Sequence, residues 1–94
     1  MDPSFNVEHS FIDCVYKHSL KFDCYLYEKN ICIEYDGIQH FEPIEYFGGT
    51  EVFNETILRD SIKNRYCEQN SIKLIRIPYW DFDNIEKIIT NEII

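Results

Sequence analysis

Apolar and polar residues alternate along two neighbouring segments in the first half of the chain. Residues 20–27 (LKFDCYLY) and 31–36 (ICIEYD) show this alternation and are rich in aromatic and β-branched residues, so both predict β-strands. The polar residues 28–30 between them predict a short turn. Residues 11–17 (FIDCVYK) predict an earlier strand, whereas residues 1–10 are expected to be loosely ordered.

The second half of the chain changes to a helical spacing. Residues 41–50 contain a proline and a glycine pair and therefore predict a loop. The spacing that follows predicts a helix over 51–69, with Thr50 as its N-cap and Asn70 as a left-handed stop. The apolar side chains at helical spacing, which we expect to face the core, are Phe53, Ile57, Leu58, Ile62 and Tyr66.

A strand over 72–77 (IKLIRI), ended by Pro78, and a helix over 84–92 complete the predicted elements. The order β-β-β-α-β-α predicts a single α/β domain over residues 1–94, built from layers of sheet and helices. The side chains that the last helix is expected to bury are Ile85, Ile88 and Ile89.

Composition and charge narrow the function classes. A hydrophobic content of 45%, with 16% aromatic residues, is typical of a globular domain. The net charge of −8 counts against a simple nucleic-acid binder, because phosphate contacts need Lys and Arg. The same charge is compatible with a nuclease that gathers carboxylates around divalent cations.

The cysteines and the length of the apolar runs indicate in which cellular compartment the protein is expected. The four cysteines, Cys14, Cys24, Cys32 and Cys67, include no CxxC pair, so we interpret them as reduced and mostly buried thiols. No apolar run approaches the roughly 18 residues that cross a bilayer, and the N-terminus lacks the pattern of a signal peptide. We therefore expect a cytoplasmic or otherwise intracellular protein without a membrane partner.

Three carboxylates are predicted to meet on one face of the sheet. Alternation along residues 31–36 places Glu34 and Asp36 on one face and the apolar residues between them on the other. A two-residue or a four-residue turn after residues 20–27 gives the same register, in which Asp23 lies opposite Glu34. Cross-strand partners lie about 5 Å apart on one face.

Three like charges at this spacing repel one another unless a cation neutralises them. Hard oxygen ligands suit Mg²⁺ or Mn²⁺, so Asp23, Glu34 and Asp36 are candidate metal ligands. His40 follows where the strand ends, and it is a candidate base for a metal-bound water or a ligand for phosphate. A metal with a base is suited to phosphodiester hydrolysis. The alternative is that these acids form an ordinary solvated face of the sheet.

The stretch FDCYLYEKNICIEYDGIQHF, followed by Arg59-Asp60, Lys63-Asn64 and IKLIRIPYW, resembles the PD-(D/E)xK restriction-endonuclease-like superfamily in its very-short-patch-repair-like branch. The resemblance covers roughly residues 11–90. It implies a mixed central sheet flanked by helices, and divalent-metal-dependent cleavage of DNA, with no small-molecule cofactor. A viral, phage or mobile-element origin is compatible with it.

The resemblance also implies roles for individual residues. Asp23 matches the first metal-binding aspartate, and Glu34 matches the acidic residue of the (D/E)xK element. Asp36 stands where the wider superfamily usually has lysine, and His40 matches the histidine of this branch. Catalysis is thereby assigned to Asp23, Glu34, Asp36 and His40, with Gln39, Arg59 and Lys63 as candidate DNA contacts.

One departure from the family pattern affects assembly. Longer relatives begin with a helix that this chain lacks before residue 11, so one sheet face is expected to be uncovered. We therefore expect a homodimer, with residues 1–17 as the candidate interface. Two rival functions remain: a catalytically degenerate nuclease fold used for nucleic-acid or protein interaction, and a zinc-stapled binding domain.

Overall fold

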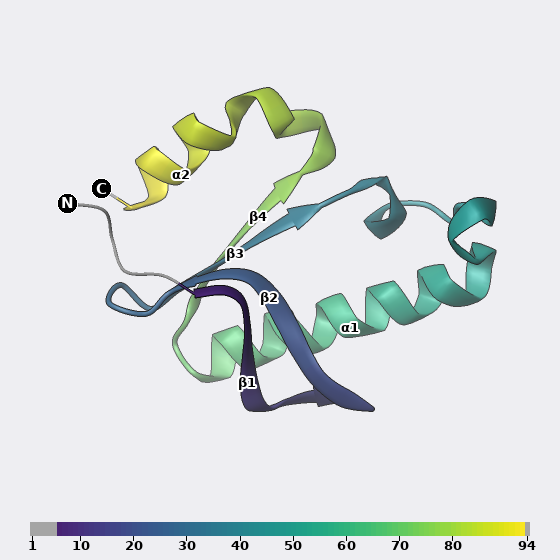
Figure 1. Cartoon of the computed structure of the whole chain (residues 1–94), viewed down its shortest axis with the longest axis horizontal. Helices are drawn as coiled ribbons and strands as arrows, with labels where there is room; N and C mark the ends of the chain where they lie inside the picture. Colours follow the sequence, from purple (N-terminus) through teal and green to yellow (C-terminus); the bar gives the residue numbers. More distant parts are fainter. Residues whose placement is uncertain (1–5, 94) are drawn as a thin grey trace.

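Four β-strands form one mixed sheet in the computed structural model, which describes residues 6–93. The strands lie in the order β1-β2-β3-β4, so β1 and β4 form the two edges (Figure 1). β1 pairs with β2 and β2 with β3 in antiparallel fashion, whereas β3 and β4 run parallel. The strand bounds are Asn6–Tyr16 for β1, His18–Leu26 for β2, Ile31–Asp36 for β3 and Lys73–Pro78 for β4.

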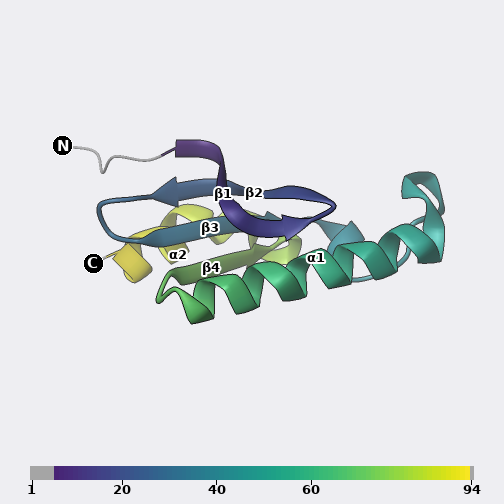
Figure 2. The ribbon, with the colours of Figure 1, turned by 90° about the horizontal axis from the view of Figure 1, so that it is seen from below.

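Two helices cover opposite faces of this sheet. α1 (Gly49–Gln69) connects β3 to β4, because parallel neighbours need a crossover, and α2 (Ile85–Ile93) follows β4. α1 packs on the face that carries Cys32, and α2 packs on the face that carries Ile33 (Figure 2). Three short 3-10 helices link the elements: η1 (Ile38–His40), η2 (Glu45–Phe47) and η3 (Tyr79–Asn84).

The predicted α/β class and the order β-β-β-α-β-α are confirmed. The first strand is longer than expected, because residues 6–10, predicted to be loosely ordered, pair with β2 through contacts such as His9 with Phe22. Residues 1–5 lie outside the described residues. Within residues 6–93, no helix is both long and apolar enough to cross a membrane.

The start and end of α1 differ from the prediction. Thr50 lies inside the helix, and the N-cap is Gly48, whose φ of 105° is left-handed. A Cβ at Gly48 would lie 2.3 Å from Val52 Cγ2, so the tight turn out of η2 requires glycine there. At the other end the left-handed residue is Ser71, with φ 56°, while Asn70 uses its side chain to donate to the Tyr66 carbonyl.

α1 also packs differently from its apolar pattern. Ile62 and Tyr66 pack on the core as expected, but Ile57 and Leu58 remain largely exposed. The reason is that the helix face turned toward the sheet carries Asp60 and Lys63. Asp60 contacts His40, and Lys63 contacts Glu34 of β3. A polar layer therefore takes the place of apolar packing in the middle of α1.

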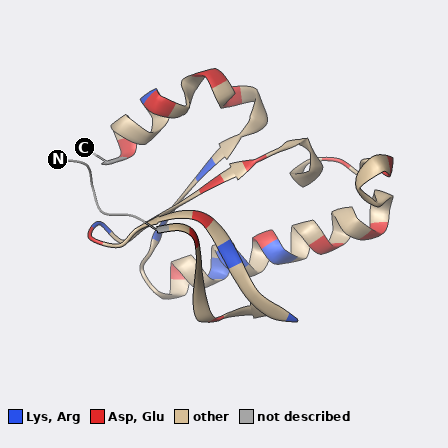
Figure 3. Cartoon of the chain, viewed as in Figure 1, with Lys and Arg blue, Asp and Glu red and all other residues tan. Residues whose placement is uncertain are grey.

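Charge is unevenly distributed over the fold. In Figure 3 the charged segments of η3 and α2 are mostly red, whereas blue segments lie at the tip of the β1–β2 hairpin, on β2 and β4 and, between red ones, along α1. The chain has 9 Lys and Arg against 17 Asp and Glu, so any grouping of cations stands out against an acidic background.

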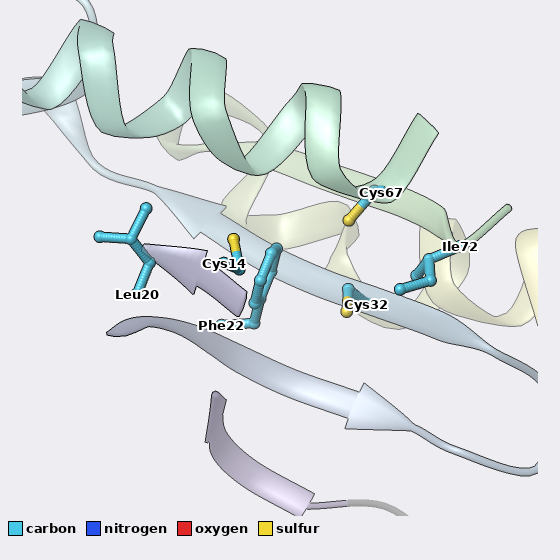
Figure 4. Packing of buried hydrophobic residues seen from close by; sticks show 6 residues of the cluster. All are labelled: Cys14, Leu20, Phe22, Cys32, Cys67 and Ile72. Atoms are coloured by element: carbon cyan, nitrogen blue, oxygen red, sulfur yellow. The ribbon is translucent and has the colours of Figure 1, made fainter. Parts of the chain in front are cut away.

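Two apolar clusters stabilise the layers. Between α1 and the sheet, Phe22 is fully buried, and it belongs to the cluster shown in Figure 4, together with Cys14, Leu20, Cys32, Cys67 and Ile72. On the opposite face, α2 packs Ile85, Ile88 and Ile89 against β3 and β4, as predicted. All four cysteines are free thiols and three of them are buried, so the expected burial of most of these side chains is confirmed.

Candidate active site

Two backbone-to-carboxylate hydrogen bonds between β2 and β3 hold the side chains of Asp23 and Glu34. The observed pairs of β2 and β3, from Cys24 with Ile33 to Leu26 with Ile31, follow the predicted register up to the residue after Asp23. The Asp23 backbone N–H donates to Glu34 Oε1 at 2.7 Å, and the Tyr35 N–H donates to Asp23 Oδ2 at 2.7 Å. Each carboxylate therefore takes a backbone donor of the other strand, and the hairpin itself holds the two acids in place.

Glu34 is a buried carboxylate with a cation from the helix. Glu34 is only 3% exposed, and Lys63 Nζ donates to Glu34 Oε2 at 2.8 Å. Burial raises the pKa of Glu34, while the hydrogen bond and charge of Lys63 act to lower it, and the charge of Asp23 adds to the increase. A buried carboxylate of this kind is stable only when it is paired.

Asp36 lies on the same side of β3 and is held by a different cation. Arg76 of β4 donates from Nη1 to Asp36 Oδ1 at 2.9 Å and to Oδ2 at 3.2 Å. The same guanidinium donates to Asn64 Oδ1 at 2.9 Å and to the Asp60 carbonyl at 3.3 Å. Arg76 of β4 thus connects β3 and α1 through its hydrogen bonds beside the site.

His40 is oriented by a carboxylate of α1. Its Nδ1 lies 2.7 Å from Asp60 Oδ2 and 3.6 Å from Asp36 Oδ1. The hydrogen bond to the Asp60 carboxylate raises the pKa of His40, burial opposes this, and the charges of Asp60 and Asp36 add to the increase. With Nδ1 bound to Asp60, Nε2 is the ring nitrogen left to meet a substrate.

The remaining predicted residues lie outside these contacts. Gln39 is exposed in η1, and its side chain folds over Gly37, where a Cβ would lie 2.5 Å from Gln39 Oε1. Arg59 donates to Glu55 at 3.2 Å, one turn earlier on α1. The structure therefore brings together Asp23, Glu34, Asp36, His40 and Lys63, while Gln39 and Arg59 lie around them.

The sequence assigns no role to Arg76 or Asn64, whereas Asp60 matches a helix position of the family motif, with phosphate contact or orientation of the site as its expected role. A signal for Arg76 is present, since it is a charged residue inside the otherwise apolar end of IKLIRI. Its position in β4 alternates with Ile75 and Ile77, which face α2, so its side chain faces the α1 side. For Asp60 and Asn64 the motif match is the signal in the sequence, because helical periodicity alone does not distinguish them from solvated polar residues.

A divalent metal fits part of this arrangement. Among the described residues, no group of three His, Cys, Asp or Glu side chains is disposed to hold a metal ion. Mg²⁺, however, is commonly bound by one or two carboxylates together with water and substrate phosphates. Asp23 and Glu34 are adjacent oxygen donors of that kind, and they would hold such an ion once Lys63 moves off Glu34.

Comparison with known proteins places the chain beside viral proteins. No family model and no solved structure matches it. It is 37% identical over 62 residues to the uncharacterized protein 307L of Invertebrate iridescent virus 6, covering 65% of this chain and 32% of that protein. It is 38% identical over 63 residues to the uncharacterized protein 094L of Frog virus 3 (isolate Goorha), covering 65% and 41%.

A third relative, the uncharacterized protein 033L of Invertebrate iridescent virus 3, is 32% identical over 63 residues, covering 66% of this chain and 32% of that protein. The chain thus spans between about a third and two fifths of the length of these relatives. Their source agrees with the expected viral origin, and the chain is similar to a segment of longer iridovirus proteins.

Proposed function

We propose that this domain is a metal-dependent DNA endonuclease with a restriction-endonuclease-like fold of the PD-(D/E)xK type. The observation that carries the proposal is the pair of backbone-to-carboxylate hydrogen bonds that hold Asp23 and Glu34 between β2 and β3, with Lys63 of α1 on Glu34. Burying Glu34 at this position costs free energy, and a purely structural face would not need it. The His40–Asp60 pair lies next to it on the same side of β3.

The side chains divide the work of hydrolysis between them. Asp23 and Glu34 would hold the divalent ion, which when bound lowers the pKa of a water and neutralises charge on the phosphate. His40, oriented by Asp60, accepts a proton at Nε2 in its neutral form. Arg76 keeps Asp36 and Asp60 at fixed positions, so the imidazole is held between two carboxylates.

Lys63 supports the proposed superfamily, although it lies at a different position from the usual lysine. Asp36 stands where the superfamily usually has its lysine, yet Lys63 reaches the Glu34 carboxylate from α1 at 2.8 Å. A lysine is thereby supplied from a helix instead of from the strand. In the proposed reaction its ammonium group leaves Glu34 and neutralises charge on the phosphate oxygens.

A second candidate is a nuclease fold that has lost catalysis and serves in binding. It is favoured by the charge pairing, because Lys63 neutralises Glu34 and Arg76 neutralises Asp36 without any metal. Calorimetric titration with Mn²⁺ separates the two candidates. Heat of binding that is abolished in Asp23→Asn supports the nuclease, whereas absence of binding in the wild type favours the degenerate fold.

Cleavage of supercoiled plasmid in Mg²⁺ or Mn²⁺ tests the proposal directly. We expect nicking by the wild type and a loss of several orders of magnitude in Glu34→Gln and Asp23→Asn, since both change a predicted metal ligand while keeping its size. Glu86→Gln, an exposed acid on α2, makes the same change of charge and should cleave normally. Equal cleavage by all four proteins would assign the activity to a contaminant or to another site.

A further inference from the structure

We infer that the tip of the β1–β2 hairpin and the middle of α1 form one contact surface for the backbone of a DNA strand. The surface consists of three cations, Lys17, Arg59 and Lys63, which we call the cation row. It begins at the hairpin tip and ends at Glu34 in the candidate active site. The choice of DNA as the ligand rests on the proposed function.

The hairpin tip is built to present Lys17. Tyr16 and His18 pair directly, so Lys17 alone makes the turn and adopts a left-handed φ of 66°. Its side chain is 61% exposed and reaches Glu55 of α1, with 3.4 Å between Lys17 Nζ and Glu55 Oε1. The ion pair of Lys17 with Glu55 therefore connects the tip of the hairpin to α1.

Arg59 continues the row on α1. It donates to the other oxygen of Glu55 at 3.2 Å, and its guanidinium lies 5.6 Å from the centre of the Tyr16 ring. Lys17 Nζ lies 5.3 Å from the same ring. One aromatic ring and one carboxylate thus hold two cations side by side, in contacts that leave part of each charge open to solvent.

Lys63 completes the row one helical turn further along. It lies four residues after Arg59, a rise of about 6 Å along α1, and its Nζ is 5.1 Å from the centre of the Phe22 ring. Its partner Glu34 belongs to the candidate active site. The row therefore leads from solvent at the hairpin tip into the site.

Charge explains why such a row suits a polyanion. Lys17 and Arg59 share the single carboxylate of Glu55, so this end of the row keeps a net positive charge. The chain as a whole carries −8 and repels nucleic acid, so a phosphate backbone is attracted only where cations are grouped. Phosphates placed on the row would approach Glu34 and His40 from the hairpin side.

A purely structural role for Glu55 would be to tie the hairpin to the helix. The two roles predict different effects for Glu55→Gln. If the row binds phosphate, removing the carboxylate frees two cations and tightens DNA binding, by roughly threefold to tenfold. If Glu55 only ties the hairpin to the helix and the row does not contact DNA, its loss leaves the affinity unchanged. Glu51→Gln, on the same helix, is the matched control and should change affinity less than about twofold.

Charge reversal at the tip gives the second measurement. We expect Lys17→Glu to weaken binding of labelled single-stranded and duplex DNA by roughly tenfold, measured by fluorescence anisotropy without divalent metal. The slope of log K against log salt should fall by about 0.7 to 0.9 for each phosphate that the variant no longer neutralises. Lys29→Glu, in the β2–β3 turn, changes the net charge equally and should bind like the wild type.

The outcomes distinguish failure of the cation row from failure of the proposed nuclease function. Equal affinities for Lys17→Glu and Lys29→Glu, or an unchanged affinity in a folded Glu55→Gln, would overturn the cation row. Binding that depends on the row without any plasmid cleavage upholds the row and overturns the nuclease. Normal cleavage by Lys17→Glu together with normal binding upholds the nuclease and overturns the row. Thermal melting followed by circular dichroism verifies that each variant is folded, and Lys17→Gln replaces Lys17→Glu if charge reversal unfolds the hairpin.

Discussion

Protonation at the candidate site is set by which groups surround each residue. Glu34 is buried beside Lys63, and burial is the largest influence on its pKa, which is raised. His40 is faced by Asp36 from β3, Asp60 from α1 and Arg76 from β4. Asp60 dominates there because it bonds the imidazole directly at 2.7 Å, and the His40 pKa is raised.

The pKa of His40 gives a prediction at the residue scale. We expect the imidazole to titrate above its ordinary value of 6.5, and Asp60→Asn to lower that pKa, both measured by NMR. Because the folded-state pKa is raised, the stabilisation by protonated His40 is complete below about pH 6.5 and is lost as the pH rises through the folded value. A His40 pKa that is unchanged in Asp60→Asn would contradict the pairing.

The same pair predicts a kinetic effect. Asp60 does not reach the substrate in the proposed reaction but orients His40, so Asp60→Asn should reduce plasmid cleavage by about 10- to 100-fold. Asp83→Asn, an exposed acid before α2, is the matched control and should leave the rate unchanged. If both variants cleave like the wild type, His40 needs no orienting partner.

At the scale of elements, α1 is positioned by the turn that precedes it. η2 and Gly48 reverse the chain so that the polar face of the helix meets β3 and β4. Gly48 combines a left-handed φ with close contact to Val52, so no other residue fits without strain. Thr50, which the pattern along the chain predicts as the cap, is exposed and inside the helix.

This difference predicts opposite results for two small substitutions. Gly48→Ala should lower the free energy of unfolding by about 1–3 kcal/mol, because alanine would be forced into a left-handed conformation against Val52. Thr50→Ala should change it by less than about 0.5 kcal/mol, whereas a true N-cap would cost about 1 kcal/mol. Urea unfolding curves measure both. A larger loss for Thr50→Ala than for Gly48→Ala would restore Thr50 as the cap.

At the scale of the whole molecule, the sheet ends in an edge strand with apolar residues outward. β1 pairs on one side only and exposes Val7, Ile12 and Val15, of which Ile12 is 91% exposed. An open edge with apolar side chains is a common place for strands of two copies to meet. Homodimer formation through residues 1–17 stays a prediction, and residues 1–5 of that segment lie outside the described residues.

Light scattering at micromolar concentration tests this assembly. We expect the wild type to have twice the mass of the 11.4 kDa chain, and Ile12→Lys to shift it to the monomer without loss of helix or strand signal. Leu58→Lys, another exposed apolar residue but on α1, should leave the dimer intact. A wild-type mass near 11.4 kDa would exclude the dimer.

The local geometry of the hairpin could be predicted from sequence alone. Turn length and alternation between residues 20–27 and 31–36 predict Asp23 opposite Glu34, and the structure has this register at the neighbouring pairs from Cys24–Ile33 to Leu26–Ile31. Alternation also puts Glu34 and Asp36 on the side of β3 that faces α1. These features depend on a few neighbouring residues and on the two-residue period of a strand, so no distant part of the chain is needed to define them.

The partners of these acids were decided only by the tertiary structure. Lys63 reaches Glu34 across 29 residues, Asp60 reaches His40 across 20, and Arg76 reaches Asp36 across 40. These contacts depend on the rotation of α1 about its axis and on the parallel pairing of β3 with β4. The apolar positions of α1 predict another rotation, in which Ile57 and Leu58 would be buried. The polar contacts of Asp60 and Lys63 occupy the middle of the interface instead, because buried charges must be paired while exposed apolar side chains cost less.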